Sequence, residues 1–140
     1  MVGILAHPDS GINSIADLKG KRVGTTFGSI NDMYLVELVR KAGFSESALN
    51  RINSTPAAMV PLFDTGKVDA MAVWEPYLTR MLEKVKGARL IVRGGDHVCF
   101  CAAAHGKPER IYKDRDVTQK YVNAMSEAAR FVRDPKNLDE

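Results

Sequence analysis

Short apolar runs alternate with amphipathic helical stretches along this chain, and that alternation limits the folds open to it. Five runs are predicted as strands, at residues 22–26, 51–54, 68–74, 89–92 and 98–103. The run at 68–74 is apolar almost throughout, which is typical of a strand covered on both faces of a parallel sheet. Because strands that alternate with helices form right-handed crossovers, we expect an α/β fold with a mostly parallel sheet.

Helix signals fit between the predicted strands. Ser14-Ile15-Ala16-Asp17 and Ser29-Ile30-Asn31-Asp32 both have the spacing of a capping box. Thr55-Pro56 suits a helix start, whereas Pro61 should bend or shorten that helix, and Glu75-Pro76 begins the next one. The last predicted helix gathers its apolar residues on one side, at Val117, Tyr121, Ala124, Met125, Ala128 and Val132.

The composition fits one globular domain and argues against several classes of partner. Of 140 residues, 45% are hydrophobic and 26% charged, so the chain can bury a sizeable core. Lys and Arg exceed Asp and Glu by 20 to 17, a scattered excess that weakly favours an anionic small ligand and indicates no nucleic-acid interface. No apolar run is long enough for membrane insertion, and residues 1–8 lack the pattern of an export signal.

Two cysteines, Cys99 and Cys101, lie two residues apart. On a strand they share one face with poor geometry for a disulfide, so we expect reduced, partly buried thiols. His97 would lie on the same face and His105 follows, but the spacing is not that of a zinc finger, so we predict no metal and no cofactor. A Cys/His nucleophile pair would also need an orienting group and an oxyanion hole, and the sequence identifies neither.

The turn at residues 25–31 is the first candidate binding site. Ligands of open α/β sheets bind beyond the carboxyl ends of the strands, and this hydroxyl-rich turn joins such an end to a helix start, whose N–H groups suit an oxyanion. In the alternative interpretation, Ser29 is only a helix N-cap and Gly28 only a turn residue. The candidate ligand-binding residues of this turn are Thr25, Thr26, Phe27, Gly28, Ser29 and Asn31.

Trp74 and Glu75 form the second candidate, at the end of the most apolar strand. An indole at the carboxyl edge of a sheet can wall a small-molecule cleft, and the Glu75 carboxylate can accept a hydrogen bond from a ligand amine. Two alternatives remain open for this corner. Trp74 can be a core residue, and Glu75 can cap the helix that Pro76 starts.

Several runs, taken in order, resemble one known family over nearly the whole chain. They are Asp9-Ser10-Gly11-Ile12, residues 16–24, the Gly28-Ser29 turn, Lys41-Ala42-Gly43-Phe44, Thr55-Pro56 and Gly66-Lys67-Val68-Asp69-Ala70, which leads to Trp74-Glu75-Pro76. This series is similar to the sulfonate/nitrate/taurine group of periplasmic solute-binding proteins of ABC importers. That group includes relatives that bind thiamine pyrimidine precursors.

The resemblance implies a three-layer αβα lobe of a type II periplasmic-binding-protein fold. It places residues 1–20 as a lead-in segment, 21–97 as the core of the second lobe, and 98–140 as a return segment with the C-terminal helix, all within one lobe of residues 1–140. The implied function is non-enzymatic binding of a small anion or zwitterion between two lobes. The implied partner is an ABC permease, and the implied location is periplasmic.

The chain also departs from that family pattern. An export signal and most of the first lobe are absent from it, so we expect either a piece of a longer protein or a half-protein that pairs with a first lobe or forms a homo-oligomer. Cys99 and Cys101 are not features of a sulfonate binder and leave the ligand class open. Two rival functions therefore stand beside transport, namely an enzyme on the same scaffold with Cys99, Cys101 and His97 in its site, and a sensory module.

Overall fold

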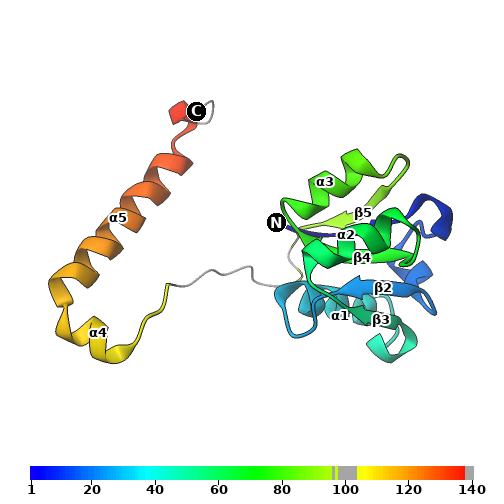
Figure 1. Cartoon of the computed structure of the whole chain (residues 1–140), viewed down its shortest axis with the longest axis horizontal. Helices are drawn as coiled ribbons and strands as arrows, with labels where there is room; N and C mark the ends of the chain where they lie inside the picture. Colours follow the sequence, from blue (N-terminus) through cyan, green and yellow to red (C-terminus); the bar gives the residue numbers. More distant parts are fainter. Residues whose placement is uncertain (96, 98–103, 138–140) are drawn as a thin grey trace. The chain divides into compact units, whose positions relative to one another are not determined.

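The computed structural model describes residues 1–95, 97 and 104–137. It contains two compact units, Met1–Cys101 and Ala102–Glu140, each described here by itself. The first unit holds the sheet and the second holds the C-terminal helices (Figure 1). The predicted strand at 98–103 lies outside the described residues, and a single lobe over residues 1–140 stays a prediction.

A five-stranded sheet forms the centre of the first unit. Its strands are β1 (Val2–Ala6), β2 (Arg22–Thr25), β3 (Asn50–Asn53), β4 (Ala70–Trp74) and β5 (Arg89–Arg93), in the order β3-β2-β4-β1-β5. β2 is parallel to β3 and β4, whereas β1 is antiparallel to β4 and β5. Four strands therefore run in one direction, which confirms the mostly parallel sheet, and the strands predicted near residues 22, 51, 68 and 89 are confirmed within two residues.

The sequence analysis did not predict a strand at residues 2–6, which form the buried strand β1. Val2 lies opposite Trp74 and Ala6 opposite Ala70, so β1 runs against β4 along its whole length. Gly3 permits this close fit, since an added Cβ would lie 2.4 Å from Leu78 Cδ1 and 2.9 Å from a backbone oxygen of β5. The strand was missed because its five apolar residues show no alternation and no preceding turn signal.

Helices cover both faces of the sheet and give the predicted three-layer αβα arrangement. α1 (Ile30–Lys41) packs on one face against β1 and β4. α2 (Pro56–Asp64) and α3 (Tyr77–Lys84) contact each other and cover the opposite face (Figure 1). Three short 3₁₀ turns, at Pro8–Ser10, Ile15–Leu18 and Glu46–Ala48, connect these elements.

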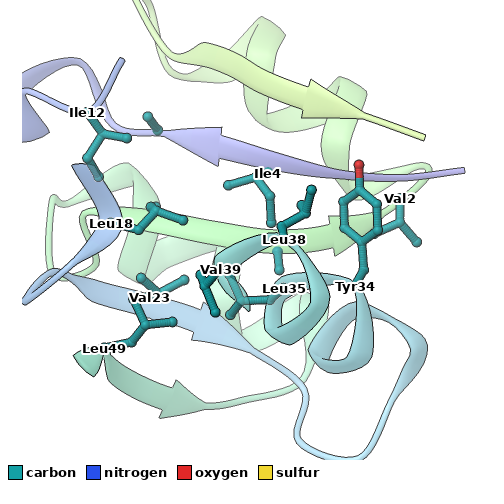
Figure 2. Packing of buried hydrophobic residues seen from close by; sticks show 13 residues of the cluster. Val2, Ile4, Ile12, Leu18, Val23, Tyr34, Leu35, Leu38, Val39 and Leu49 are labelled. Atoms are coloured by element: carbon teal, nitrogen blue, oxygen red, sulfur yellow. The ribbon is translucent and has the colours of Figure 1, made fainter. Parts of the chain in front are cut away.

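Each face of the sheet has its own hydrophobic core. On the α1 face, Leu35, Leu38 and Val39 point toward Ile4 and Val23 of the strands (Figure 2). The core on the other face lies under α2 and α3 and contains Leu5, Met59, Phe63, Val68, Met71, Val73, Leu78, Met81 and Val85. Because side chains alternate along a strand, the two cores use alternate residues of β1 and β4.

The predicted helix starts are confirmed in their hydrogen bonds. Asp17 accepts from the backbone N–H groups of Asn13 and Ser14 and from the Ser14 hydroxyl. These bonds, the Asn13 N–H first, hold the pKa of Asp17 below its ordinary value. Thr55 Oγ1 accepts from the N–H of Ala58 at 3.3 Å. Pro61 lies inside α2, and the helix continues three residues beyond it to Asp64.

The second unit consists of α4 (Pro108–Lys113), α5 (Arg115–Arg133) and a final 3₁₀ turn (Pro135–Asn137). The predicted C-terminal amphipathic helix is confirmed as α5. Its large apolar residues are exposed, and none of the described residues of α4 or α5 is buried. Among the described residues, no helix has the length and apolar character needed to cross a membrane.

Candidate functional site

The carboxyl ends of β2 and β4 bring the two predicted site segments to one edge of the sheet. β2 and β4 are neighbours in parallel register, with Val23 opposite Ala70 and Gly24 opposite Met71. The turn after β2 and the Trp74 corner after β4 therefore emerge on adjacent strands. This is the edge at which open α/β sheets bind ligands.

Thr25 and Asn31 are fully buried beside this edge, and their side chains have no hydrogen-bond partner among the residues that the structure describes. Val23 belongs to the core under α1, so Thr25 points to the same face of β2. Among the described residues, Thr25 Oγ1 and both amide atoms of Asn31 make no hydrogen bond. An unsatisfied buried polar group costs on the order of 1–3 kcal/mol, so three such atoms at one helix start are unusual.

The other two hydroxyls of the turn are used internally. Thr26 Oγ1 donates to the Ser54 carbonyl at 2.8 Å, which ties the turn to the end of β3. Ser29 Oγ donates to the Thr26 carbonyl at 2.6 Å and accepts from the Asn31 N–H at 3.2 Å. Ser29 is therefore the N-cap of α1, as the alternative interpretation has it.

Two N–H groups early in the turn are bound by side chains that the sequence analysis did not select. The Phe27 N–H donates to Asn53 Oδ1 at 3.0 Å. The Gly28 N–H donates to Asp32 Oδ2 at 3.2 Å, and the φ of Gly28 is +71°, a conformation that favours glycine. Asp32 was visible as the last residue of a capping-box spacing, whereas no local signal pointed to Asn53.

The free donors lie at the start of α1 itself. The Ser29 N–H donates to the Thr26 carbonyl at 3.2 Å, and Asn31 N–H is taken by Ser29 as described. Among the hydrogen bonds of the described residues, none is donated by the N–H of Ile30 or of Asp32. In the described part of the chain, two orphan donors of the first turn of α1 thus have no internal acceptor.

An ion pair holds this helix start against β3. Arg51 Nη1 donates to Asp32 Oδ1 at 3.0 Å, and both side chains are largely shielded from solvent. The Arg51 guanidinium also lies 4.8 Å from the centre of the Phe27 ring, a cation–π distance. Phe27 lies at the carboxyl edge of the sheet and is 44% exposed, so the part of its ring that does not contact Arg51 is accessible to a ligand.

The Trp74 corner combines packing with a second ion pair. Trp74 is partly buried against the core under α1. Glu75 Oε2 accepts from the N–H and hydroxyl of Thr79, and Glu75 Oε1 accepts from Arg93. Burial raises the pKa of Glu75, but the bonds from Thr79 and the charge of Arg93 outweigh it, so the net pKa is lowered. Glu75 therefore caps α3, as one alternative predicted.

His97 lies next to α1 and contacts Tyr34 and Lys41. Its ring centroid is 5.9 Å from that of Tyr34, and Nδ1 is 3.2 Å from Lys41 Nζ. No group of three or more potential metal ligands occurs among the described residues. Cys99 and Cys101 lie outside that part of the chain, so their reduced state stays a prediction.

A separate groove of about 610 Å³ lies at the amino ends of β2 and β4, a feature that sequence reasoning missed. Arg22 and Asp69 line it and form a bidentate pair, in which Arg22 Nη2 and Nε bond Asp69 oxygens at 2.6 and 3.1 Å. Lys84 pairs with Asp64 at 2.7 Å on another wall. These charges satisfy one another, so this groove is a poor candidate for ligand binding.

Comparison with known proteins identifies the family. Residues 1–137 match the family described as NMT1/THI5 like. The chain is 30% identical over 151 aligned residues to the putative aliphatic sulfonates-binding protein of Bacillus subtilis, covering 99% of this chain and 45% of that protein. The chain therefore spans less than half the length of this curated relative.

Solved structures of sulfonate-binding proteins also match this chain. The periplasmic aliphatic sulphonate binding protein SsuA of Escherichia coli matches with a TM-score of 0.77 and 29% identity, over 98% of this chain and 47% of that one. The alkanesulfonate-binding protein SsuA of Xanthomonas axonopodis pv. citri, bound to MOPS, matches with a TM-score of 0.63 and 32% identity, over 68% and 32%. A desulfurization enzyme at 15% identity and a TM-score of 0.52 shares the fold alone. The E. coli and B. subtilis relatives are named as sulfonate-binding proteins, and the chain belongs to the NMT1/THI5-like family.

Proposed function

We propose that this chain is the ligand-binding lobe of a periplasmic solute-binding protein that delivers a small sulfonate, or a related anion or zwitterion, to an ABC permease. The observation that carries the proposal is the start of α1. Among the described residues, the N–H groups of Ile30 and Asp32 have no internal acceptor there, and the buried polar side chains of Thr25 and Asn31 have no hydrogen-bond partner.

The start of α1 suits one oxyanion group. The N–H groups of Ile30 and Asp32 have no internal acceptor among the described residues, and the positive end of the helix dipole favours a negative charge there. A sulfonate offers three acceptor oxygens. Thr25 and Asn31 carry further buried donors without partners among the described residues, and a ligand oxygen that reached them would supply the missing hydrogen bonds.

The surroundings of this helix start favour an organic anion over a bare inorganic one. Phe27 presents its exposed ring beside the turn, and Trp74 stands at the end of the neighbouring strand. Aromatic rings at these two places can contact the carbon chain or ring of an organic sulfonate. The charges beside them, Asp32 with Arg51 and Glu75 with Arg93, are already paired, which leaves the site near neutral and tolerant of a zwitterion.

The relatives support the ligand class, the location and the partners. The E. coli and B. subtilis proteins are named for aliphatic sulfonates, the E. coli protein is described as periplasmic, and the Xanthomonas protein was crystallised with MOPS, a sulfonate. Because this chain spans 47% of the E. coli structure, we propose that a second lobe completes the site and that both lobes together engage the permease. The enzyme hypothesis has no such support, since the desulfurization enzyme shares the fold alone and Cys99 and Cys101 lie outside the described residues.

A titration followed by NMR tests the proposal on the chain as it stands. Methanesulfonate, MOPS, nitrate and acetate are added while the amides of Ile30 and Asp32 and the Trp74 indole are observed. If one lobe supplies about half of a micromolar binding free energy of roughly −8 kcal/mol, the chain alone should bind at about −4 kcal/mol, near millimolar. Sulfonates are expected to shift these resonances more than acetate does.

Two matched variants test whether the response in the titration comes from the start of α1. Ser29→Glu places a carboxylate where the anion should sit, so we expect it to abolish the response. Ser45→Glu makes the same change at the N-cap of the 3₁₀ turn Glu46–Ala48 and should leave binding unchanged. The site is wrong if anions instead shift resonances near His105 while residues 28–32 stay still, or if Ser29→Glu binds as well as the parent chain.

A further inference from the structure

The turns at the carboxyl edge of the sheet contain no basic residue. The turns after β2, β3 and β4 include residues 26–32, 54–58 and 75–79, and none of these positions is Lys or Arg, although the chain has 20 such residues. By contrast, four lysines lie in the loops that lead into β2, β4 and β5 at the amino edge, namely Lys19, Lys21, Lys67 and Lys86. An anion at the carboxyl edge therefore receives no cation from these turns.

The two arginines near the carboxyl edge are both paired with carboxylates. Arg51, in β3, donates from Nη1 to Asp32 Oδ1 at 3.0 Å and lies against the Phe27 ring. Arg93, at the end of β5, pairs with Glu75. Each pair is neutral as a whole, so the charges of these four side chains sum to zero.

The donors at the start of α1 are neutral groups. They are the N–H groups of Ile30 and Asp32, the Thr25 hydroxyl and the Asn31 amide, for which the described residues supply no acceptor. The helix dipole adds about half a positive charge at this end of α1. Neutral donors with a partial charge of this size suit a ligand with one negative charge better than a ligand with two.

Asp32 places a carboxylate at the same helix start. Its Oδ2 accepts from the Gly28 N–H at 3.2 Å, and its own N–H is one of the two donors without an internal acceptor in the described part of the chain. An anion bound to that N–H lies close to the carboxylate of the same residue. The Asp32 side chain is only 14% exposed, so water screens the repulsion weakly.

We infer that the start of α1 selects singly charged anions and discriminates against doubly charged anions such as sulfate, and that Asp32 sets this discrimination. The inference rests on the proposed function, because it concerns the same site. The attraction of an ion to the site grows in proportion to its charge, whereas the Born cost of removing it from water grows with the square of its charge. A dianion therefore gains about twice the attraction of a monoanion but loses about four times the hydration.

A comparison of two anions tests the selection on the chain as it stands. Methanesulfonate and sulfate are titrated at pH 7 and constant ionic strength while the amides of Ile30 and Asp32 are followed by NMR. Methanesulfonate should bind at least about tenfold more tightly than sulfate. Equal or tighter binding of sulfate would overturn this inference and leave the proposed function standing, whereas a chain that binds neither anion would overturn both.

Methylphosphonate separates charge from shape, because it resembles methanesulfonate and changes its charge with pH. A phosphoryl group loses its second proton near neutral pH, so this ligand passes from a monoanion to a dianion between about pH 6 and about pH 9. Its binding should weaken at least about tenfold over that range. Methanesulfonate keeps one charge throughout, so its titration reports any change that comes from the protein. Methylphosphonate that binds as tightly in its dianionic form would contradict the inference.

Substitutions of Asp32 and Arg51 should change the selectivity in opposite directions. Asp32→Asn keeps the N–H donor and removes the negative charge. It should strengthen methanesulfonate binding about threefold and sulfate binding about tenfold, because a dianion experiences twice the change in electrostatic energy. Arg51→Gln removes the positive charge instead and should widen the preference for methanesulfonate.

Glu37→Gln is the matched control for Asp32→Asn. It makes the same change of charge farther along α1, where Glu37 lies 3.5 Å from Lys41, and should leave the ratio of the two affinities at the parent value. If Asp32→Asn keeps the parent ratio, or if Glu37→Gln changes the ratio as much, Asp32 does not set the discrimination.

Discussion

The amino and carboxyl edges of the central sheet differ in how their polar side chains are hydrogen-bonded. At the amino ends of β2 and β4, Arg22 and Asp69 satisfy each other through two side-chain bonds, and Arg22 also donates to the Gly66 carbonyl. At the carboxyl end of β2, by contrast, Thr25 and Asn31 are buried without partners in the described part of the chain. Both edges involve β2, so the same strand carries paired polar groups at one end and an unpaired one, Thr25 Oγ1, at the other in the described part of the chain.

The comparison separates polar residues that stabilise the fold from polar residues that we propose to bind a ligand. A satisfied ion pair contributes to the folded state, whereas unsatisfied buried groups lower its stability and persist where a ligand compensates. The amino edge therefore has the character of a structural seam, although a groove of about 610 Å³ lies there. At the carboxyl edge, the proposed ligand would compensate the buried groups that have no partner in the described part of the chain.

The largest expected effect on stability comes from a substitution that should destabilise the whole sheet, and with it both edges. Gly3 lies in β1, which joins the sheet, and Gly3→Ala would bring a Cβ to 2.4 Å from Leu78 and 2.9 Å from the Val92 carbonyl. We expect it to destabilise the first unit by about 3 kcal/mol, measured by urea denaturation. Gly106→Ala, where the nearest atom is 3.6 Å away, is the control and should cost little. Equal stability of the two variants would contradict the packing of β1.

A smaller effect is expected at the amino edge, and it should depend on pH. The side-chain bond from Arg22 holds the pKa of Asp69 below its ordinary value against the opposing effect of burial. A lowered folded pKa stabilises the protein above the unfolded pKa, and this stability is lost as the pH falls through the folded pKa. Asp69→Asn should therefore cost about 2 kcal/mol at pH 7 and progressively less toward about pH 3.

Urea denaturation of Asp69→Asn at several pH values checks this prediction. Glu83→Gln removes a carboxylate that makes no ion pair among the described residues, so it should change stability little at either pH. If Asp69→Asn costs as much at pH 3 as at pH 7, the Arg22 pair is not the source of the stability.

The smallest expected effect has the opposite sign and lies at the carboxyl edge. Thr25→Val removes a buried hydroxyl without a partner, so we expect it to stabilise the chain by about 1 kcal/mol while it weakens sulfonate binding. Thr55→Val removes a hydroxyl that caps α2 and should cost about 1 kcal/mol instead. Thermal denaturation and the NMR titration measure both quantities. A destabilised Thr25→Val variant would mean that this hydroxyl is satisfied in solution.

Much of the scaffold around the site was predictable from local pattern. The apolar runs near residues 22, 51, 68 and 89 became strands, and the Ser14 and Thr55 signals became helix caps. The position of the site also followed from the sequence, because a turn after a parallel strand must emerge at its carboxyl edge. The strand β1 was not predicted, because its short apolar run has no periodicity that distinguishes a strand from a buried linker.

The sequence by itself determined where the candidate turn lies and which donors it carries, since both follow from residue types and their order. Only the tertiary structure decided which donors remain free. The N–H of Phe27 is taken by Asn53 from β3, and Arg51 of the same strand pairs with Asp32. These partners lie 26 and 19 residues away along the chain, and they reach the turn only because β3 pairs with β2 in one register. Strand register arises from the packing of the whole sheet, so no local pattern reveals it.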